Sequence, residues 1–186
     1  LSTGMPPHLV VGTNKLVGTF GTLTASVTFI RKGLFQPALW WAMSFGTFVG
    51  ALVGAVLIYL MSAGVLKKLL PLAILLAAAY LVWPRRARPS ATPPEPPLPP
   101  HSVRRGIKLA TGGLIGFYDG FIGPGTGAFW MAAAMKLFRL DLVAAAGVAR
   151  FMNFISNLAA LLTFMVFGNI DYVIGLSMGM LLMVGT

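Results

Sequence analysis

Three charged residues lie within long apolar stretches of this 186-residue chain, and they are the first candidates for chemistry. Asp119 is the only acid well inside such a stretch, while Lys15 and Arg150 each lie about two helical turns into a stretch of their own. A charge at the centre of a bilayer costs ~3 kcal/mol on insertion scales, so it usually serves an ion or substrate pathway. We interpret Asp119 as a proton acceptor, a gate or a ligand of a polar substrate group. The alternative is a structural role, in which Asp119 caps the break or pairs with Lys15 or Arg150.

Asp119 lies in a glycine-rich interruption of apolar sequence, GFYDGFIGPGTGAFW at residues 116–130. Helix-breaking residues at membrane depth are tolerated where the loosened backbone is buried in protein or lines a cavity. The stretch therefore predicts a broken or re-entrant helix that forms half of a solute site. Tyr118 and Asp119 are the candidate coupling or gating residues of that site.

Lys15 and Arg150 are the candidate substrate-binding cations, because they occupy matched positions of the internal repeat described below. Two cations that face one another need an anion, and a helix start at residues 125–127 would offer it backbone N–H groups and a positive dipole end. Snorkelling to the interface is the alternative for the cations, and bonding between helices is the alternative for the nearby asparagines. The predicted substrate-binding set is Asn14, Lys15, Gly123, Gly125, Thr126, Gly127, Arg150, Asn153 and Asn157.

The composition argues against several other kinds of site. The chain has no Cys, and its two His residues, His8 and His101, lie far apart, so the sequence predicts no thiol chemistry, no metal site and no cofactor. No nucleophile lies near a base, so no catalytic residue is predicted and the chain is not expected to be an enzyme. The 14 Lys and Arg residues outnumber the 4 Asp and Glu residues and cluster in short loops between apolar runs, which is typical of membrane topology signals and not of nucleic-acid binding.

A composition that is 57% hydrophobic, with a mean hydropathy of +0.84, predicts an all-α polytopic membrane protein, a helical bundle that has the lipid bilayer as its solvent. The candidate membrane spans are residues 9–30, 38–61, 69–83, 142–167 and the stretch that begins at 172. Within the second span, Gly46, Gly50 and Gly54 form a smooth stripe against which another helix can pack closely.

A basic, proline-rich segment divides the chain into two halves. It carries an arginine cluster and the run PPEPPLPP, and we expect residues 84–105 to form an extended cytoplasmic linker. Residues 1–83 would then be the first half, with about three spans, and residues 106–186 the second half.

Shifting the first half by 135 positions (150 − 15) aligns it weakly with the second. The matched pairs include Gly12 with Gly147, Phe29 with Phe164, Gly33 with Gly168 and Lys15 with Arg150. Transporters are commonly built from such repeats, and we expect the two halves to be inverted, with a parallel arrangement as the alternative. The same arithmetic leads us to expect roughly 28 residues before Leu1, with a counterpart of the glycine-rich stretch, and roughly 32 after Thr186.

Three segments resemble the TauE/SafE sulfite-exporter family, specifically its YfcA-like branch: GTNKLVGTFGTLTASVTFIRKG at residues 12–33, GFYDGFIGPGTGAF at 116–129 and ARFMNFISN at 149–157. With the span spacing, the resemblance covers essentially the whole chain. It implies a helical membrane permease for anionic sulfur compounds or organic sulfonates, with ion coupling. It also implies a glycine-rich stretch before residue 12 and further spans after residue 186, so that the chain would be truncated at both ends.

Two hypotheses of function follow from the sequence. The first is a multi-pass secondary transporter of the plasma (inner) membrane that moves a small anion, a sulfur oxyanion or organosulfonate such as sulfite. The second is a membrane scaffold or assembly subunit that uses the glycine stripe as its working surface, and a homo-oligomer is compatible with either. The sequence leaves open which anion is carried, in which direction and with which coupling ion.

Overall fold

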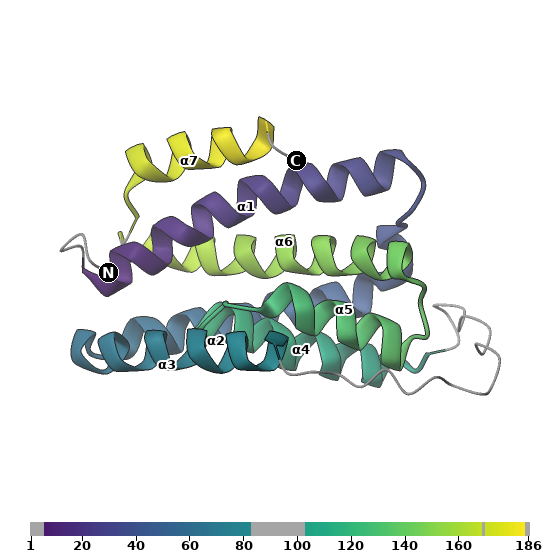
Figure 1. Cartoon of the computed structure of the whole chain (residues 1–186), viewed down its shortest axis with the longest axis horizontal. Helices are drawn as coiled ribbons and strands as arrows, with labels where there is room; N and C mark the ends of the chain where they lie inside the picture. The colour runs from purple at the N-terminus through teal and green to yellow at the C-terminus, as the bar shows by residue number, and fades with distance from the viewer. Residues whose placement is uncertain (1–5, 83–102, 169, 185–186) are drawn as a thin grey trace.

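The computed structural model describes residues 6–82, 103–168 and 170–184, and over these ranges the chain is helical, with no strand (Figure 1). The helices are α1 (Pro7–Arg31), the 3-10 helix η1 (Pro37–Trp40), α2 (Trp41–Leu60), α3 (Ala63–Val82), α4 (Arg105–Phe121), α5 (Thr126–Leu137), α6 (Leu142–Val166) and α7 (Tyr172–Val184). The predicted all-α class is confirmed. The predicted linker falls almost wholly on residues 83–102, outside the described residues.

Two helical segments among the described residues are long and apolar enough to cross a membrane, Pro37–Leu60 and Leu142–Val166, and Tyr172–Val184 is apolar but shorter. They agree within two residues with the predicted spans at 38–61 and 142–167. Helix α1 has 25 residues and is therefore about 37 Å long, enough to cross. It does not meet the same apolar criterion, because its sequence carries many Gly and Thr residues as well as Lys15, so the span at 9–30 stays a prediction.

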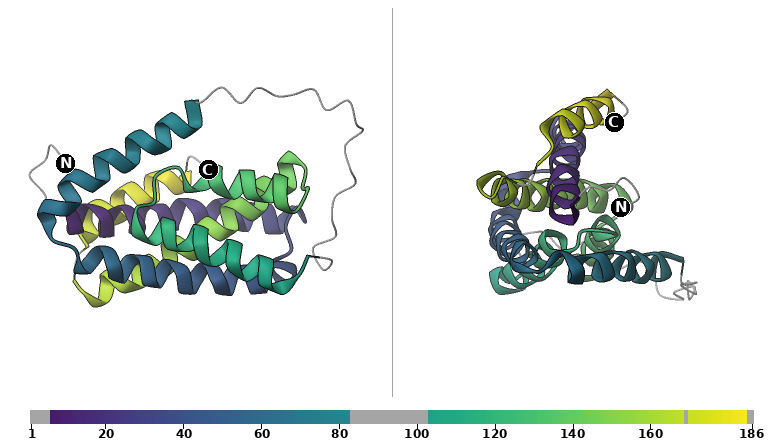
Figure 2. Two further views of the ribbon diagram at one scale, coloured as in Figure 1. Left: turned by 90° about the horizontal axis from the view of Figure 1, so that it is seen from below. Right: turned by 90° about the vertical axis from the view of Figure 1, so that its left-hand side faces the viewer.

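Helices α2 and α4 lie side by side (Figure 2). They run in parallel, and a stripe of glycines lines each side of their contact. The glycines are Gly46, Gly50 and Gly54 on α2, and Gly112, Gly116 and Gly120 on α4. A Cβ atom on any of them would overlap backbone atoms of the other helix, so only glycine permits this approach. The close packing predicted for the α2 stripe is confirmed, and its partner is a helix of the same chain.

Helices α4 and α5 form a hairpin, because the start of α4 and the end of α5 reach the same tryptophan. The Lys108 ammonium lies 5.3 Å from the centre of the Trp40 ring, and the Phe138 ring packs edge-on against the same ring, 5.0 Å away. The turn between the two helices therefore lies at the opposite end of the hairpin. With 12 residues, α5 is about 18 Å long, too short to cross a bilayer alone, and this agrees with the predicted broken or re-entrant helix.

Helices α1 and α6 cross the middle of the bundle and run in opposite directions, with α7 at the outer side of α1 (Figures 1 and 2). Gly18 lies beside Asn157 and Gly147 lies beside Phe29, so the residue numbers rise on one helix as they fall on the other. The bounds of the two helices differ by the 135 positions of the sequence repeat (142 − 7 and 166 − 31). This antiparallel pairing of matched helices agrees with the expected inverted arrangement.

Gly33 and Gly168, which follow α1 and α6, repeat the same local backbone. Their φ angles are 68° and 69°, in the left-handed region that favours glycine after a helix end. The repeat is therefore visible in the way the matched helices end as well as in their length.

Two hydrophobic clusters lie along α6, and a polar layer separates them. One cluster includes Ala145, Val148 and Met152, and the other includes Ala160 and Phe164. Between them, at residues 153–157, α6 carries two asparagines and a serine. Since apolar packing holds the helix on both sides, these polar side chains are kept in place within the bundle.

Candidate functional site

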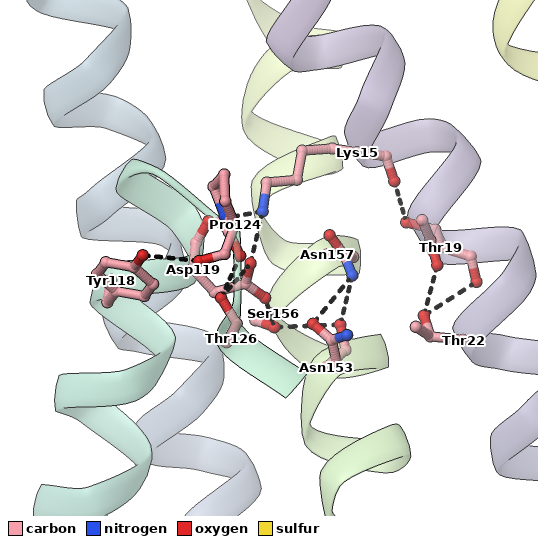
Figure 3. Close-up of polar contacts among 12 residues, drawn as sticks. Lys15, Thr19, Thr22, Tyr118, Asp119, Pro124, Thr126, Asn153, Ser156 and Asn157 are labelled. Carbon is pink, nitrogen blue, oxygen red and sulfur yellow. Dashed lines mark hydrogen bonds and ion pairs between the residues drawn. The ribbon is translucent and has the colours of Figure 1, made fainter. Parts of the chain in front are cut away.

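Lys15 and Asp119 form a buried ion pair at the centre of the polar layer (Figure 3). Lys15 Nζ donates to Asp119 Oδ1 at 2.8 Å and to the Asp119 backbone carbonyl at 2.6 Å. Both side chains are 3% exposed. Of the two roles considered for Asp119, the ion pair with Lys15 is therefore present, and the buried pair is electrically neutral.

Two hydroxyl groups complete the surroundings of the Asp119 carboxylate. Thr126 Oγ1, at the start of α5, lies 3.3 Å from Oδ1, and the Ser156 hydroxyl of α6 donates to Oδ2. The carboxylate thus joins four helices, α1, α4, α5 and α6. A buried carboxylate with one cation and the Ser156 hydroxyl as donor has its charge compensated, as burial requires.

The glycines of the hairpin turn are required by its backbone. Gly123 and Gly125 have φ angles of 90° and 80°, in the left-handed region, and Gly125 caps α5. A Cβ on Gly123 would lie 3.2 Å from Lys15 Nζ and 3.3 Å from Asp119 Oδ1. The turn therefore brings its backbone against the ion pair only because it carries no side chain there.

Tyr118 holds the turn and does not contact the ion pair directly. Its hydroxyl donates to the Pro124 carbonyl at 2.7 Å, and its ring packs edge-on against Phe129, 5.1 Å away. The Thr126 hydroxyl also donates to the Gly123 carbonyl. These bonds link the end of α4 to the start of α5, so a movement of Tyr118 would change the shape of the turn.

A cavity of about 270 Å³ opens beside the ion pair, and we call it the ion-pair cavity. Among the residues that line it are Asn14, Lys15, Asp119, Gly123, Asn153 and Asn157. All six belong to the sequence-predicted site. Asn157 Nδ2 donates to the Asn153 carbonyl at 2.8 Å, so the asparagines bond within α6 and leave other amide atoms for the cavity.

A second cavity of about 310 Å³ lies between α5 and α6, and we call it the arginine cavity. Arg150, Asn153 and Gly127 are among the residues that line it. Arg150 is exposed, and within the described residues its guanidinium has no hydrogen-bond or ion-pair partner. Asn153 lines both cavities, which makes it the polar residue common to them.

Gly127, in the first turn of α5, lies on the wall of the arginine cavity. The amides of Thr126, Ala128 and Phe129 already donate to the carbonyls of Gly123 or Gly125. Within the described residues, the Gly127 amide has no backbone acceptor of this kind. An N–H group at a helix start carries part of the positive end of the helix dipole, so an anion beside Arg150 would be stabilised from both sides.

Lys15 and Arg150 do not face one another, which corrects the arrangement expected from the repeat. Gly18 lies beside Asn157 and Gly147 beside Phe29, so Arg150 is about ten residues, or ~15 Å, from the level of Lys15 along the α1–α6 pair. The reason is the antiparallel packing, which places matched positions symmetrically about the crossing point. The predicted cations therefore belong to separate cavities.

Ser156 is the site residue that the sequence reasoning missed. Its hydroxyl donates to the Asp119 carboxylate from α6, and the side chain is completely buried. The signal in the sequence was its position in ARFMNFISN, one turn after Asn153, which places both polar side chains on one part of the α6 surface. Within the part of the chain that the structure describes, no group of three His, Cys, Asp or Glu residues could hold a metal ion.

Comparison with known proteins gives one family and several relatives. The family model described as "Sulfite exporter TauE/SafE" matches residues 1–186. A protein of Haemophilus influenzae named "Probable membrane transporter protein" is 35% identical over 96% of this chain and 68% of its own length. A Sinorhizobium protein, "Probable membrane transporter protein ORF9", is 34% identical over 97% of this chain and 67% of its own length. The Escherichia coli K12 protein "Probable membrane transporter protein YfcA" is 33% identical over 96% of this chain and 64% of its own length. No solved structure matches.

Proposed function

The chain belongs to the sulfite exporter TauE/SafE family and is a membrane transporter of that family, and on this premise we propose that it moves a small anion, a sulfur oxyanion or organosulfonate such as sulfite. We propose further that it is a multi-pass permease of the plasma (inner) membrane and not an enzyme. Its spans would be α1, α2, α3 and α6, and the α4–α5 hairpin would enter the bilayer and return.

The observation that carries this proposal is the buried ion pair of Lys15 and Asp119 beside the ion-pair cavity. The Asp119 carboxylate already neutralises the Lys15 ammonium, and the proposal is that an arriving anion takes the place of the carboxylate. Such an exchange could gate the passage of the anion, because the ammonium would be paired with a negative charge both before and after the exchange. The asparagines on the cavity wall can donate further hydrogen bonds to the arriving anion.

The exchange also provides a way to couple the anion to a proton. When the anion takes Lys15 from Asp119, the carboxylate would be left as a buried negative charge, which costs ~3 kcal/mol or more at membrane depth. Taking up a proton removes that cost, since a neutral carboxyl can still accept a hydrogen bond from the Ser156 hydroxyl. The proposal is therefore that one anion and one proton bind together and leave together.

The arginine cavity is the proposed entry point for the anion. Arg150 is exposed there and has no protein partner among the described residues, while Gly127 lies on the same cavity wall. Asn153 lines both cavities and would accompany the anion from Arg150 toward Lys15. The two predicted cations would thus act one after the other along a path and not together.

The alternative function, a scaffold that uses the α2 glycine stripe, is not supported by the fold. The stripe is covered by α4 of the same chain, so it is not open to a partner.

The distribution of basic residues along the bundle supports an orientation for the permease. The end of α1, the start of α4 and the end of α5 meet around Trp40 and Phe138, and these helix ends carry Arg31, Arg105 and Lys136. This end of the bundle would be cytoplasmic by the positive-inside rule.

The test is a counterflow assay with the full-length protein in proteoliposomes. Vesicles loaded with sulfite, thiosulfate, sulfoacetate, phosphate or chloride are challenged with radiolabelled sulfite. We expect the sulfur anions to exchange, phosphate and chloride to exchange weakly, and an inward proton gradient to drive net sulfite movement. Equal exchange with all five anions would reject specificity for sulfur compounds, and no exchange with any of them would reject the permease.

A further inference from the structure

A third cavity, of about 230 Å³, lies at the basic end of the bundle, away from the ion pair, and we call it the tryptophan cavity. It lies between the start of α2 and the start of α4. The residues with polar or aromatic groups on its wall are Trp41, Arg105 and Lys108. Its volume is several times the ~30 Å³ that one water molecule occupies in the liquid, so it can hold a phosphate group.

Lys108 is a nearly buried cation on the wall of this cavity. The residue is 6% exposed, and its ammonium donates to the Leu39 carbonyl at 3.1 Å and lies over the Trp40 ring at 5.3 Å. An ammonium has three N–H donors, so two remain for another acceptor. Burying a cation is costly unless an anion compensates it, and a carbonyl and a ring compensate it only in part.

The described acids are engaged elsewhere. Asp119 binds Lys15, while the Asp141 side chain caps α6 and that of Asp171 accepts from an amide in the first turn of α7. The chain has only four acids, and the remaining one, Glu95, lies outside the described residues. Among the described residues, therefore, no acid bonds to Lys108, and the described part of the chain supplies no anion to the tryptophan cavity.

Arg105 and the start of α4 add to the positive charge at the tryptophan cavity. Arg105 precedes Lys108 by three residues, so the two side chains lie on one face of α4. Its guanidinium lies 5.6 Å from the centre of the Trp41 ring, and no side chain caps this helix start. The helix dipole therefore points its positive end at the same place as the two cations.

An exposed apolar stripe on α2 leads away from the tryptophan cavity. Trp41, Phe45, Val49 and Val53 follow one another at every fourth position, and their exposed fractions are 56%, 60%, 42% and 54%. Residues four apart lie on one face of a helix, so the stripe runs along the bundle toward its middle. A phosphate bound at Arg105 and Lys108 would thus have room for an acyl chain along this stripe.

We propose that the tryptophan cavity binds the phosphate of an anionic phospholipid from the membrane leaflet at the basic end of the bundle. Arg105 and Lys108 hold the phosphate, Trp41 lies at the level of the headgroups, and an acyl chain follows the α2 stripe. Basic pockets between helices and interfacial tryptophans both recognise such lipids. This site is separate from the transport path and does not depend on the proposed substrate.

The test measures lipid binding to the purified full-length protein by native mass spectrometry. Phosphatidylglycerol and phosphatidylcholine with the same acyl chains are compared in detergent micelles. We expect phosphatidylglycerol to bind more tightly, Arg105→Gln to weaken its binding about fivefold, and the double variant with Lys108→Gln to weaken it about 30-fold, from the energy of one basic residue near an anionic lipid. Phosphatidylcholine binding should change little.

The matched control is Lys136→Gln, which removes an exposed charge at the same end of the bundle but outside the cavity. Arg105 is exposed, so its substitution should not disturb folding, and size-exclusion chromatography checks this for every variant. Equal weakening by Lys136→Gln, or unchanged binding in the Arg105→Gln variant, overturns the site. Displacement of phosphatidylglycerol by millimolar inorganic phosphate or sulfite would show a soluble anion site and overturn the lipid assignment.

Discussion

Removing the two charges of the ion pair, one at a time and then together, separates a structural role of the pair from a role in transport. The variants are Lys15→Met, Asp119→Asn and the double variant. Both side chains are 3% exposed, so each single change leaves an uncompensated buried charge. Breaking a buried pair in this way costs about 3–5 kcal/mol.

The double variant leaves neither charge behind. The asparagine introduced at position 119 has one oxygen in place of two, so it can accept from one of the two hydroxyls, while its NH2 group can donate to the oxygen of the other. Replacing both members of a buried pair by neutral groups is often nearly without cost, so we expect the double variant within about 2 kcal/mol of the wild type. The two single changes would then be coupled by about 4 kcal/mol or more.

The assay measures unfolding free energy in mixed micelles and sulfite counterflow in proteoliposomes for the same four proteins. We expect stability to fall in both single variants and to return in the double variant, while transport is lost in all three. A double variant that is stable and transports sulfite at the wild-type rate would refute the gate at Lys15 and Asp119. Stability losses that simply add would show that the two side chains are not coupled as the geometry requires.

Two further substitutions test the arginine cavity and the glycine packing. Arg150→Gln should lower the sulfite transport rate at least tenfold, because a bond to a charged group is worth about 1.5–3 kcal/mol. Stability should change little, because the Arg150 side chain is exposed. Lys136→Gln is the control, and an equal loss of transport in that variant would contradict a specific role of Arg150. Gly50→Ala should lower the unfolding free energy by about 1–3 kcal/mol, because the added Cβ would overlap the α4 backbone. Gly64→Ala should not lower it, because the space around Gly64 is open. An equal shift of the thermal unfolding temperature in both variants would contradict the packing argument.

Much of the fold could be predicted because it rests on local patterns. Apolar runs of the right length predict helices wherever they occur, and the α2 and α6 bounds agree with the predicted spans within a few residues. The break in the glycine-rich stretch was predictable for a similar reason, since Gly123 and Gly125 adopt φ angles that other residues rarely take. The repeat was visible as a weak alignment and corresponds to α1 and α6, which have the same length.

The sequence predicted which residues belong to the candidate site better than it predicted which of them lie together. Lys15, Asp119 and Asn157 all line one cavity, as expected, whereas Arg150 lines another. Ser156 was missed because a serine in an apolar helix commonly bonds its own backbone, as this one also does to the Met152 carbonyl. Only its neighbour across the helix contact gives it a second role.

The sequence by itself determined the membrane class, the helices, the broken segment and the residues that could carry charge into the bundle. These follow from composition and from spacing along one helix, which act over a few residues. The tertiary structure alone decided which charges meet. Because α1 and α6 pack in opposite directions, Lys15 reaches Asp119 across the bundle while its repeat partner, Arg150, is carried to another level. Matched positions of the repeat lie at equal distances on either side of the point where α1 and α6 cross. Two matched residues therefore meet only when both lie close to that crossing point.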